Sequence, residues 1–346
     1  MAKQESILQV AGRQIKLTNL DKVLYPKVGF TKGQVVDYMV RIAPVLLPHL
    51  AGRPLTLKRY PEGVEGMFFY EKNCPKHRPD WVNTAKVWSE GNNRYMYYCV
   101  VDELPTLVWL ANLADLELHT SLAVVPEIHK PTVIAFDLDP GPPANIVQCC
   151  QVGLWIRDIF AQLGLQAFPK TSGSKGLQVY VPLNTSVNFD QTKTFANAVA
   201  RLLEERYPDQ VVSDMKKALR TNRVFVDWSQ NDDHKTTICV YSLRAKDQPT
   251  VSTPVTWSEV ETCLKKSDPQ VLGFISDQVL QRVEEMGDLF EPVLKLKQKL
   301  PPIESLQEFA EGATTEVVDA KPIKPRNISS VERPRKSPRR RTARKA

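Results

Sequence analysis

The chain has 346 residues, of which 42% are hydrophobic and 25% charged, as is ordinary for a globular protein. No apolar stretch reaches the roughly 20 residues that cross a bilayer, and the N-terminus lacks the apolar core of a signal peptide, so we exclude an integral membrane protein and expect a cytoplasmic, nucleoid-associated one. Residues 321–346 carry a net charge of about +10, whereas residues 1–320 hold 35 basic and 38 acidic residues. Any nucleic-acid site within residues 1–320 must therefore be a local patch of basic residues.

The first part of the chain is predicted to combine short strands with two helices. Alternating residues indicate a hairpin that turns at Gly12 and Arg13. Thr31 is the expected N-cap of a helix that runs to Leu50. The remaining elements expected here are strands at 54–60, 66–72 and 94–101, a turn at 91–93, and a helix at 105–118.

From Thr132 the pattern changes to strands in alternation with longer helices. Strands are expected at 132–140, 166–172, 176–183, 223–230 and 236–245, and helices at 144–164 and 190–208 and within 257–300. We expect an α/β fold of antiparallel sheets flanked by helices, in a monomer. The predicted division is a DNA-binding part (1–130), a catalytic core (131–300) and a Pro-rich, basic, disordered tail (301–346).

The six cysteines show no zinc-ligand spacing. No C-x-x-C pair and no suitably placed histidine accompanies them, so structural zinc is not expected. In a reducing cytosol we expect all six to be free thiols, namely Cys74, Cys99, Cys149, Cys150, Cys239 and Cys263.

The strongest local signal for chemistry is the pair Asp137 and Asp139 in FDLDPG. Alternate residues of a strand share one face, so both carboxylates point the same way at the end of an apolar strand. Hard oxygen ligands of this kind suit Mg²⁺ or Mn²⁺. Glycosyltransferases also use an Asp-x-Asp pair, and a solvated turn is the plain structural alternative.

Two further signals point to nucleotidyl transfer. The loop TSGSKG contains small residues around Lys175, which suits a phosphate group, although it is not a Walker loop. Asp227 is another acid inside an apolar strand, with basic residues on both sides of it in the sequence. Three carboxylates beside cationic groups are what two-metal nucleotidyl transfer requires.

Together these motifs resemble a known family. FDLDPG, SGSKGLQVYVPL, VFVDWSQN and KTTICVYSLRA, in this order, are similar to the polymerase domain of bacterial non-homologous end-joining ligase D, a member of the archaeo-eukaryotic primase superfamily. LDKVLYPKVGFTK, HLAGRPLTLKRYPEG and FFYEKNCP extend the similarity upstream, so that it covers roughly residues 8–300. The resemblance implies a primase-polymerase core and template-directed filling of short gaps or ends with rNTPs or dNTPs, with primer synthesis also possible.

The resemblance also implies a role for each matching residue. Asp137, Asp139 and Asp227 would be the metal-binding, catalytic carboxylates. The nucleotide would contact His119, Ser172, Lys175, Gln178, Arg220, Gln230, Lys235 and Arg244. DNA with a 5′-phosphate would bind at Lys22 and Lys32, and its template would stack on Phe69 and Tyr70.

One position departs from the family pattern. Gln178 stands where the family usually has a histidine that faces the triphosphate, and glutamine cannot carry charge. We expect weaker phosphate binding or slower catalysis, not inactivity. The alternative from another class is a DNA-end-binding repair scaffold with little catalysis. No K-x-D-G adenylation motif is present, so a separate DNA ligase, and with it an end-binding protein, is the expected partner.

Overall fold

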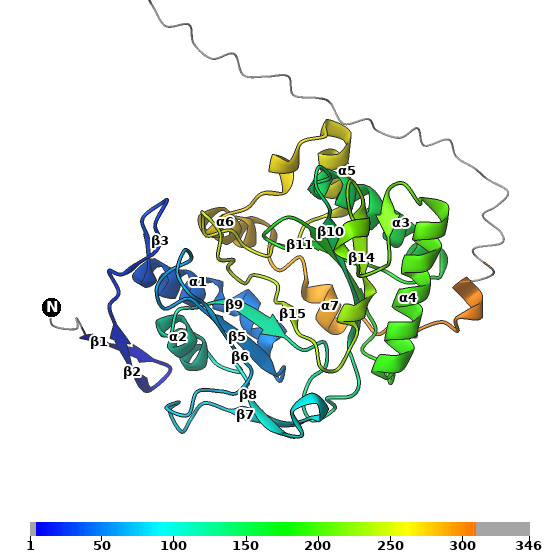
Figure 1. Cartoon of the computed structure of the whole chain (residues 1–346). Helices are drawn as coiled ribbons and strands as arrows, with labels where there is room; N and C mark the ends of the chain where they lie inside the picture. The colour runs from blue at the N-terminus through cyan, green and yellow to red at the C-terminus, as the bar shows by residue number, and fades with distance from the viewer. Residues whose placement is uncertain (1–4, 307, 309–346) are drawn as a thin grey trace, which may run out of the picture.

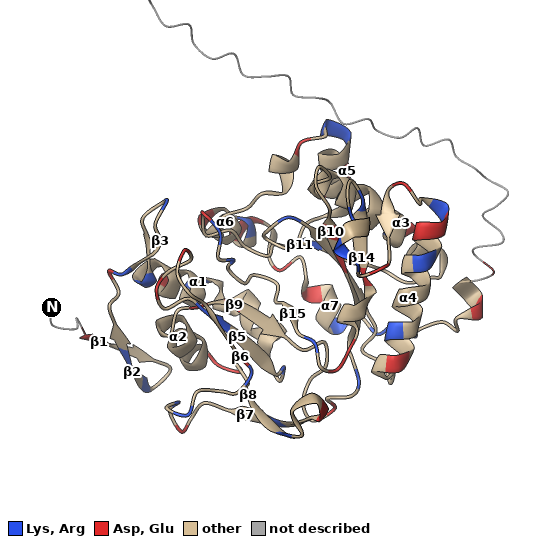
Figure 2. Ribbon diagram, in the orientation of Figure 1, with Lys and Arg blue, Asp and Glu red and all other residues tan. Residues whose placement is uncertain are grey.

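The computed structural model describes residues 5–306 and residue 308, and two main sheets dominate it (Figure 1). Two small hairpins precede them: β1 (Glu5–Val10) with β2 (Arg13–Thr18), and β3 (Val23–Tyr25) with β4 (Phe30–Thr31). The basic segment 321–346 lies outside the described residues, and so does most of the tail predicted to be disordered. Basic and acidic residues are interspersed over the described body (Figure 2), in line with the near balance of charge in residues 1–320.

The first main sheet has six strands and draws on distant parts of the chain. Its order is β15-β9-β5-β8-β7, and β6 also pairs with β5. The strands are β5 (Leu55–Arg59), β6 (Phe69–Glu71), β7 (Thr84–Ser89), β8 (Arg94–Cys99), β9 (Asp115–Thr120) and β15 (Thr237–Ile238). Because β15 follows all the strands of the second sheet in sequence, the chain returns to complete the first sheet after building the second.

The second main sheet has five strands in the order β11-β12-β10-β14-β13. The strands are β10 (Val133–Pro140), β11 (Phe168–Thr171), β12 (Leu177–Pro182), β13 (Val211–Val212) and β14 (Val224–Asp227). All of its pairs are antiparallel except β13 with β14. Antiparallel sheets with flanking helices confirm the predicted fold class. The division into residues 1–130 and 131–300 stays a prediction.

Helices cover the outer faces of both sheets. The helices are α1 (Lys32–Leu50), α2 (Leu104–Asn112), α3 (Ile146–Gln162), α4 (Phe189–Arg206), α5 (Trp257–Lys266), α6 (Ser276–Met286) and α7 (Glu291–Lys295). α1 packs on α2 beside the first sheet, and α3 and α4 pack on β10 of the second (Figure 1). Thr31 caps α1 through a reciprocal bond pair with Gln34, as expected. Among the described helices, none has the length and apolarity of a membrane span.

Alternation along β10 explains where the acids lie. Ile134, Phe136 and Leu138 belong to the core under α3 and α4, on one face of the strand. Val133 and Ala135 face the other way, into the core shared with the first sheet. Asp137 and Asp139 continue this second face, because side chains in a strand alternate. The carboxylates therefore emerge on the side of the second sheet that faces the first.

The structure corrects several predicted elements. The helix predicted to reach Leu118 ends at Asn112, because Ala114 adopts a positive φ of 56° and β9 then begins at Asp115. Strand β7 was not predicted, and β15 contains only Thr237 and Ile238 of the predicted 236–245. The hairpin turn at 91–93 is present as a short 3₁₀ turn between β7 and β8.

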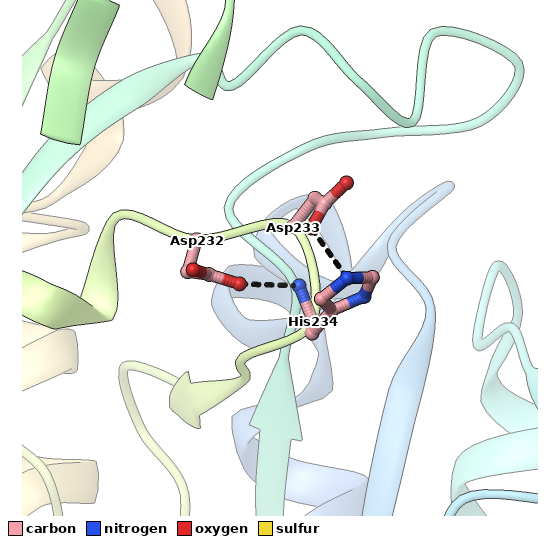
Figure 3. A group of neighbouring side chains, drawn as sticks. All are labelled: Asp232, Asp233 and His234. Atoms are coloured by element: carbon pink, nitrogen blue, oxygen red, sulfur yellow. Dashed lines mark hydrogen bonds and ion pairs between the residues drawn. The ribbon is translucent and has the colours of Figure 1, made fainter. Parts of the chain in front are cut away.

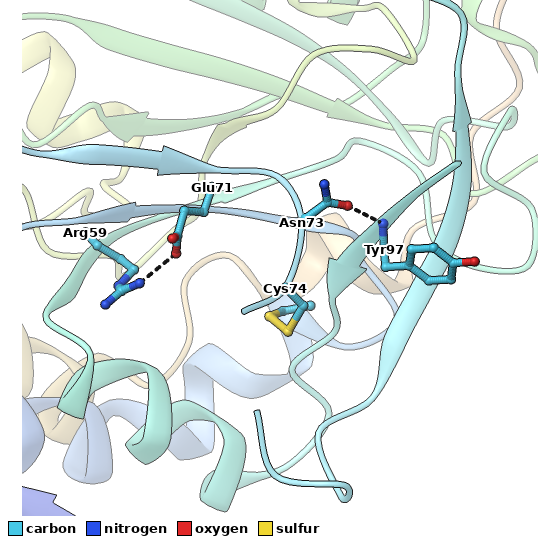
Figure 4. The surroundings of a disulfide bond; sticks show 6 residues. Arg59, Glu71, Asn73, Cys74 and Tyr97 are labelled. Carbon is cyan, nitrogen blue, oxygen red and sulfur yellow. Dashed lines mark hydrogen bonds and ion pairs between the residues drawn. A yellow bond between two sulfur atoms is a disulfide. The ribbon is translucent and has the colours of Figure 1, made fainter. Parts of the chain in front are cut away.

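The expectation of six free thiols is wrong at one pair. Cys74, just after β6, and Cys99, at the end of β8, form a disulfide with 4.8 Å between their Cα atoms (Figure 4). Tyr97 brings the segments together: its carbonyl accepts from the Cys74 N–H at 2.6 Å, and its own N–H donates to Asn73 at 2.8 Å. These two contacts carry no spacing signal in the sequence. Cys149, Cys150, Cys239 and Cys263 are buried and free, as expected.

Candidate active site

The predicted carboxylates lie in a cross-strand row on the second sheet. Asp137 on β10 is the register partner of Asp227 on β14 on one side and of Gln178 on β12 on the other. Gln178 is in turn the register partner of Lys170 on β11. Directly opposed residues of an antiparallel pair have Cβ atoms about 5 Å apart, so these four side chains are neighbours on one face.

Clustering of negative charge raises the pKa of the acids on β10. Burial, the charge of Asp139 and the charge of Asp227 raise the pKa of Asp137 to about 7, against opposing effects of Gln178 and Lys170. The pKa of Asp139 is raised as well, by partial burial and then by Asp227, although Arg220 opposes this. Three carboxylates that disfavour one another's ionisation are a suitable donor set for a divalent cation.

Asp227 is held in place by its own turn. Its Oδ1 accepts hydrogen bonds from the Ser229 N–H at 3.0 Å and from the Ser229 hydroxyl at 2.5 Å, and its Oδ2 accepts from Gln230 Nε2 at 2.8 Å. Lys235 donates to the same Ser229 hydroxyl. The structure thus gathers Gln230 and Lys235, both predicted nucleotide contacts, around this carboxylate.

Arg220 adds positive charge at the open side of the row. Its guanidinium lies 3.9 Å from the Asp139 carboxylate and stacks on the Phe225 ring at 3.7 Å. One terminal nitrogen donates to the Met215 carbonyl at 2.8 Å. Its Nε is buried and has no hydrogen-bond partner among the described residues. The stacking fixes the guanidinium while leaving donor capacity for an anion.

The loop between β11 and β12 is rigidly held but leaves its lysine free. The Ser172 hydroxyl accepts the N–H groups of Ser174 and Gly176 at 3.2 and 3.1 Å. A Cβ at Gly176 would lie 2.1 Å from the Leu138 carbonyl oxygen, so only glycine fits against the strand of the acids. Lys175 is exposed, forms no ion pair among the described residues, and lies close enough to lower the pKa of Asp139.

Across from the acids, the first sheet presents a buried carboxylate that sequence reasoning missed. Glu117 on β9 is 2% exposed and contacts three cationic or ionisable groups: His119 at 3.2 Å, Lys58 at 3.3 Å and Arg244 at 3.4 Å. Burial alone would raise the pKa of Glu117, but the His119 hydrogen bond and the charges of Arg244 and Lys58 hold it well below its ordinary value. The alternation of Glu117 and His119 in LELHT was an available signal, equivalent to that of FDLD.

Arg244 connects this cluster to the phosphate-type loop. Its terminal nitrogen donates to the Ser172 carbonyl at 2.5 Å, while its Nε faces Glu117. His119, on β9, is largely buried, and burial lowers the pKa of its imidazole despite the opposing effect of Glu117. The structure therefore brings His119, Ser172 and Arg244, all predicted nucleotide contacts, into one continuous network.

Gln178 sits at the centre of the site with half of its amide unsatisfied. It is 2% exposed; its Nε2 donates to the Thr237 hydroxyl at 3.3 Å, and its Oε1 is buried without a partner among the described residues. Thr237 belongs to β15, so this bond joins the second sheet to the first.

The predicted DNA contacts lie apart from the acids. Lys22 and Lys32 are brought together by a bond from the Lys32 N–H to the Lys22 carbonyl at 2.8 Å. Lys22 pairs with Glu62 at 2.9 Å, whereas Lys32 is 6% exposed and donates to the Thr18 carbonyl at 2.6 Å. Burial, and then the charge of Lys22, lowers the pKa of Lys32 to about 8.

Phe69 and Tyr70 are both exposed on β6, at 47% and 60%, but they point to opposite faces of the strand. Tyr70 groups with Phe68 instead, with ring centroids 5.7 Å apart, and it lies 6.2 Å from the His119 ring. The adjacent pair predicted from sequence is therefore split, and only Tyr70 turns toward the nucleotide side.

A second acidic group lies on the loop after β14. Among the described residues, Asp232, Asp233 and His234 form the group whose ligand atoms all lie within 4.8 Å of one another (Figure 3). Asp232 is already paired with Lys193 at 2.6 Å, and all three belong to one surface turn. The row of Asp137 and Asp227 instead has polar and cationic groups converging on it from both sheets, which favours the row as the catalytic centre.

Comparison with known proteins identifies the family. A model described as the LigD primase-polymerase domain matches residues 31–290. The chain belongs to this family. As a LigD-type primase-polymerase, it is a nucleotidyltransferase by class, as predicted.

Known LigD proteins resemble this chain over part of their length. The chain is 40% identical over 287 residues to the multifunctional non-homologous end joining protein LigD of Mycolicibacterium smegmatis. The aligned region covers 81% of this chain and 36% of that protein. The bifunctional LigD of Bacillus subtilis is 30% identical over 275 residues, 79% of this chain and 43% of that protein. The matched region thus spans less than half the length of either relative.

A solved structure has the same fold. The polymerase domain of Mycobacterium tuberculosis ligase D, in complex with DNA, matches with a TM-score of 0.76 and 40% identity over 82% of this chain and 99% of that domain. The similarity therefore covers the whole polymerase domain of that relative.

Proposed function

We propose that this LigD-type domain is a template-directed polymerase that fills short gaps or ends in bacterial DNA repair by end joining. The observation that carries the proposal is the row of Asp137, Asp227 and Gln178, with Asp139 beside it, facing the network of Glu117, His119 and Arg244 across the two sheets. One side offers a cation-binding carboxylate set, and the other offers groups for an incoming nucleotide.

The carboxylates would hold Mg²⁺ or Mn²⁺, and such a cation, when bound, supplies activation of a primer 3′-hydroxyl and charge neutralisation of the triphosphate. The chain's own groups complete the site. We expect Lys175 and Arg220 to receive phosphate oxygens, because neither has a carboxylate at hydrogen-bond distance among the described residues. Arg244 fixes the loop of Ser172, and Glu117 orients His119 toward the nucleotide side.

A primer-extension assay tests this function. The substrate is a short gap with a 5′-phosphate at its downstream edge, and rNTPs and dNTPs are compared in Mg²⁺ and in Mn²⁺. We expect template-matched addition that requires one of the two metals. DNA binding without any addition under all four conditions would contradict the polymerase and support the end-binding scaffold. Because a filled gap leaves a nick, we expect a DNA ligase as partner and, at DNA ends, an end-binding protein.

Gln178→His is expected to improve the enzyme. An imidazole at this position can be protonated beside Asp137 and the triphosphate, so it supplies charge that the amide lacks. We expect a lower KM for the nucleotide or a higher kcat in steady-state extension assays. Gln178→Asn is the matched control, because its shorter amide retracts from Thr237 without adding charge. A fall in kcat/KM for the histidine variant would show that Gln178 belongs to a tuned network.

A 5′-phosphate at the downstream edge of a gap is expected to strengthen binding through Lys22 and Lys32. Each charge-assisted contact contributes roughly 1.5–3 kcal/mol when desolvated, and less for the partly exposed Lys22. Because the pKa of Lys32 is lowered to about 8, its share of the phosphate effect falls as the pH rises above that value.

The measurement compares phosphorylated and unphosphorylated gaps by titration at pH 7 and pH 9. Lys22→Ala combined with Lys32→Ala should remove the preference for phosphate, whereas Lys193→Ala, a lysine paired elsewhere with Asp232, should keep it. Equal affinities of the unsubstituted protein for the two gaps would show that neither lysine binds the 5′-phosphate.

A further inference from the structure

A cavity between the two main sheets holds two buried cations that lack a carboxylate partner. The cavity has a volume of about 30 Å³, and both sheets line it: Thr120 and Cys239 come from or follow the strands of the first, and Val133, Lys170 and Tyr180 from the second. Arg53, just before β5, also lines it. It lies beside the catalytic row, since Lys170 is in that row, bonds through its ammonium group to Ile238 and Ser252, and is close enough to lower the pKa of Asp137.

Lys170 is completely buried and only partly satisfied. Its ammonium group donates to the Ile238 carbonyl at 3.0 Å and to the Ser252 hydroxyl at 2.7 Å, which leaves one of its three N–H groups. It lies 5.4 Å from the centre of the Tyr180 ring. No described carboxylate forms an ion pair with it.

Arg53 is also buried and only partly satisfied. It is 9% exposed, and two of its five N–H groups are used, by the Ser121 carbonyl at 3.2 Å and the Thr132 hydroxyl at 2.9 Å. No described carboxylate pairs with it either. The third basic residue of the cavity differs, because His49 is bonded to Asp288 at 2.8 Å. Within the described residues, Lys170 and Arg53 are thus the unneutralised members.

The thiol of Cys239 does not supply the missing charge. The charges of Lys170 and Arg53 are close enough to lower the pKa of this thiol. Burial has the larger effect and raises the pKa to about 12, so the thiol remains protonated at neutral pH. Burial of an ion without a counter-charge costs several kcal/mol, and proteins normally pair such ions or shift their pKa. Burial accordingly lowers the pKa of Lys170 to about 7, and a bound anion would favour its charged form. A water molecule satisfies hydrogen bonds but leaves the charge uncompensated.

We propose that this cavity is a binding site for a small monatomic anion, chloride, held between Lys170 and Arg53. A volume of about 30 Å³ is enough for a water-sized species and therefore for one halide ion. Apolar walls from Val133, Val240 and Phe290 suit a weakly hydrated anion. The Ser121 hydroxyl, which accepts from the Ala123 N–H, keeps its own proton available as a further donor. The anion would join the two sheets electrostatically.

Anomalous diffraction from crystals of the full chain grown in bromide tests the site directly. We expect an anomalous peak in the cavity, in contact with Lys170 Nζ and the Arg53 guanidinium. A cavity with water and no anomalous peak at saturating bromide would overturn the proposal.

Thermal unfolding tests it in solution. At constant ionic strength, chloride or bromide in place of methanesulfonate, a larger polyatomic anion, should raise the unfolding midpoint with saturation. Lys170→Met and Arg53→Met, tested separately because either variant can fail to fold, should abolish the difference between the anions. Lys193→Met, which removes a lysine outside the cavity, should keep it. A full halide response in a folded cavity variant, or none in the unsubstituted protein, would overturn the proposal.

Discussion

Asp137→Asn and Asp227→Asn are each expected to lower nucleotide incorporation by about a thousandfold or more, a loss of about 4 kcal/mol of transition-state stabilisation. Asparagine keeps the size of the side chain and removes the charge that would hold the cation. Binding of gapped DNA should survive, because the residues predicted to contact DNA lie elsewhere. Single-turnover extension and DNA titration measure the two effects separately.

Asp137→Asn is expected to raise the stability of the metal-free protein, although it lowers activity. Because the pKa of Asp137 is raised to about 7, the folded state binds more protons than the unfolded state between about pH 4 and pH 7, and its stability falls as the pH rises through that range. Above pH 7 the ionised carboxyl is a net cost in the absence of metal. Asp137→Asn removes this cost, so metal-free protein at pH 8 should unfold at a higher temperature than the unsubstituted protein. A merely structural carboxylate would give the reverse.

Asp232→Asn is the control that separates the two acidic sites. Asp232 lies in the surface group with Asp233 and His234, and its loss should leave extension within about twofold of the unsubstituted rate. If Asp232→Asn abolished extension while Asp137→Asn did not, the assignment of the metal to the cross-strand row would be wrong.

Glu117→Gln is expected to weaken nucleotide binding and to destabilise the fold together. The change leaves Lys58 and Arg244 without their shared buried carboxylate, and removal of one partner of a buried ion pair costs about 3 kcal/mol or more. Arg244 also holds the Ser172 carbonyl, so the loop that carries Lys175 should loosen. We expect KM for the nucleotide to rise by at least about tenfold, with a smaller change in kcat.

The pH dependence follows from the direction of the Glu117 shift. Its pKa is lowered in the folded protein, so its stabilising contribution is present above the unfolded value of about 4.5 and is lost progressively as the pH falls from there through the lower folded value. Denaturant unfolding at pH 7 and pH 4 should show this loss in the unsubstituted protein and not in Glu117→Gln. Glu71→Gln, which removes a more exposed partner of Arg59, should change stability by less than about 1 kcal/mol. Unchanged nucleotide affinity in a folded Glu117→Gln variant would contradict its positioning role.

Much of the second sheet and its acids could be predicted from sequence because the signals are local. The apolar run before Asp137, the Asp-x-Asp alternation and the glycines of the loop each act within a few residues, and the structure has strands and a loop at those places. The helix start at Thr31 was equally local, since a capping box involves only residues three apart.

What the sequence did not indicate depends on contacts between distant segments. Glu117 meets Arg244 only because β15 and the chain after it return to β9. Cys74 meets Cys99 because the Cys74 N–H donates to the Tyr97 carbonyl and the Tyr97 N–H donates to the Asn73 side chain. The helix predicted at 105–118 was too long because its leucine-rich sequence favours a helix throughout. The positive φ of the single residue Ala114 ends α2 earlier.

The late return of β15 has a consequence for how the chain folds. During synthesis β9 emerges early, but Thr237 and Ile238, which cover its edge, emerge only after every strand of the five-stranded sheet. Until then β9 keeps unpaired backbone groups along one side, a surface that favours aggregation. Contacts of such high sequence separation form slowly. A fragment that stops before residue 237 would therefore expose this edge permanently, and in the whole chain the two sheets should gain protection from hydrogen exchange as one cooperative unit.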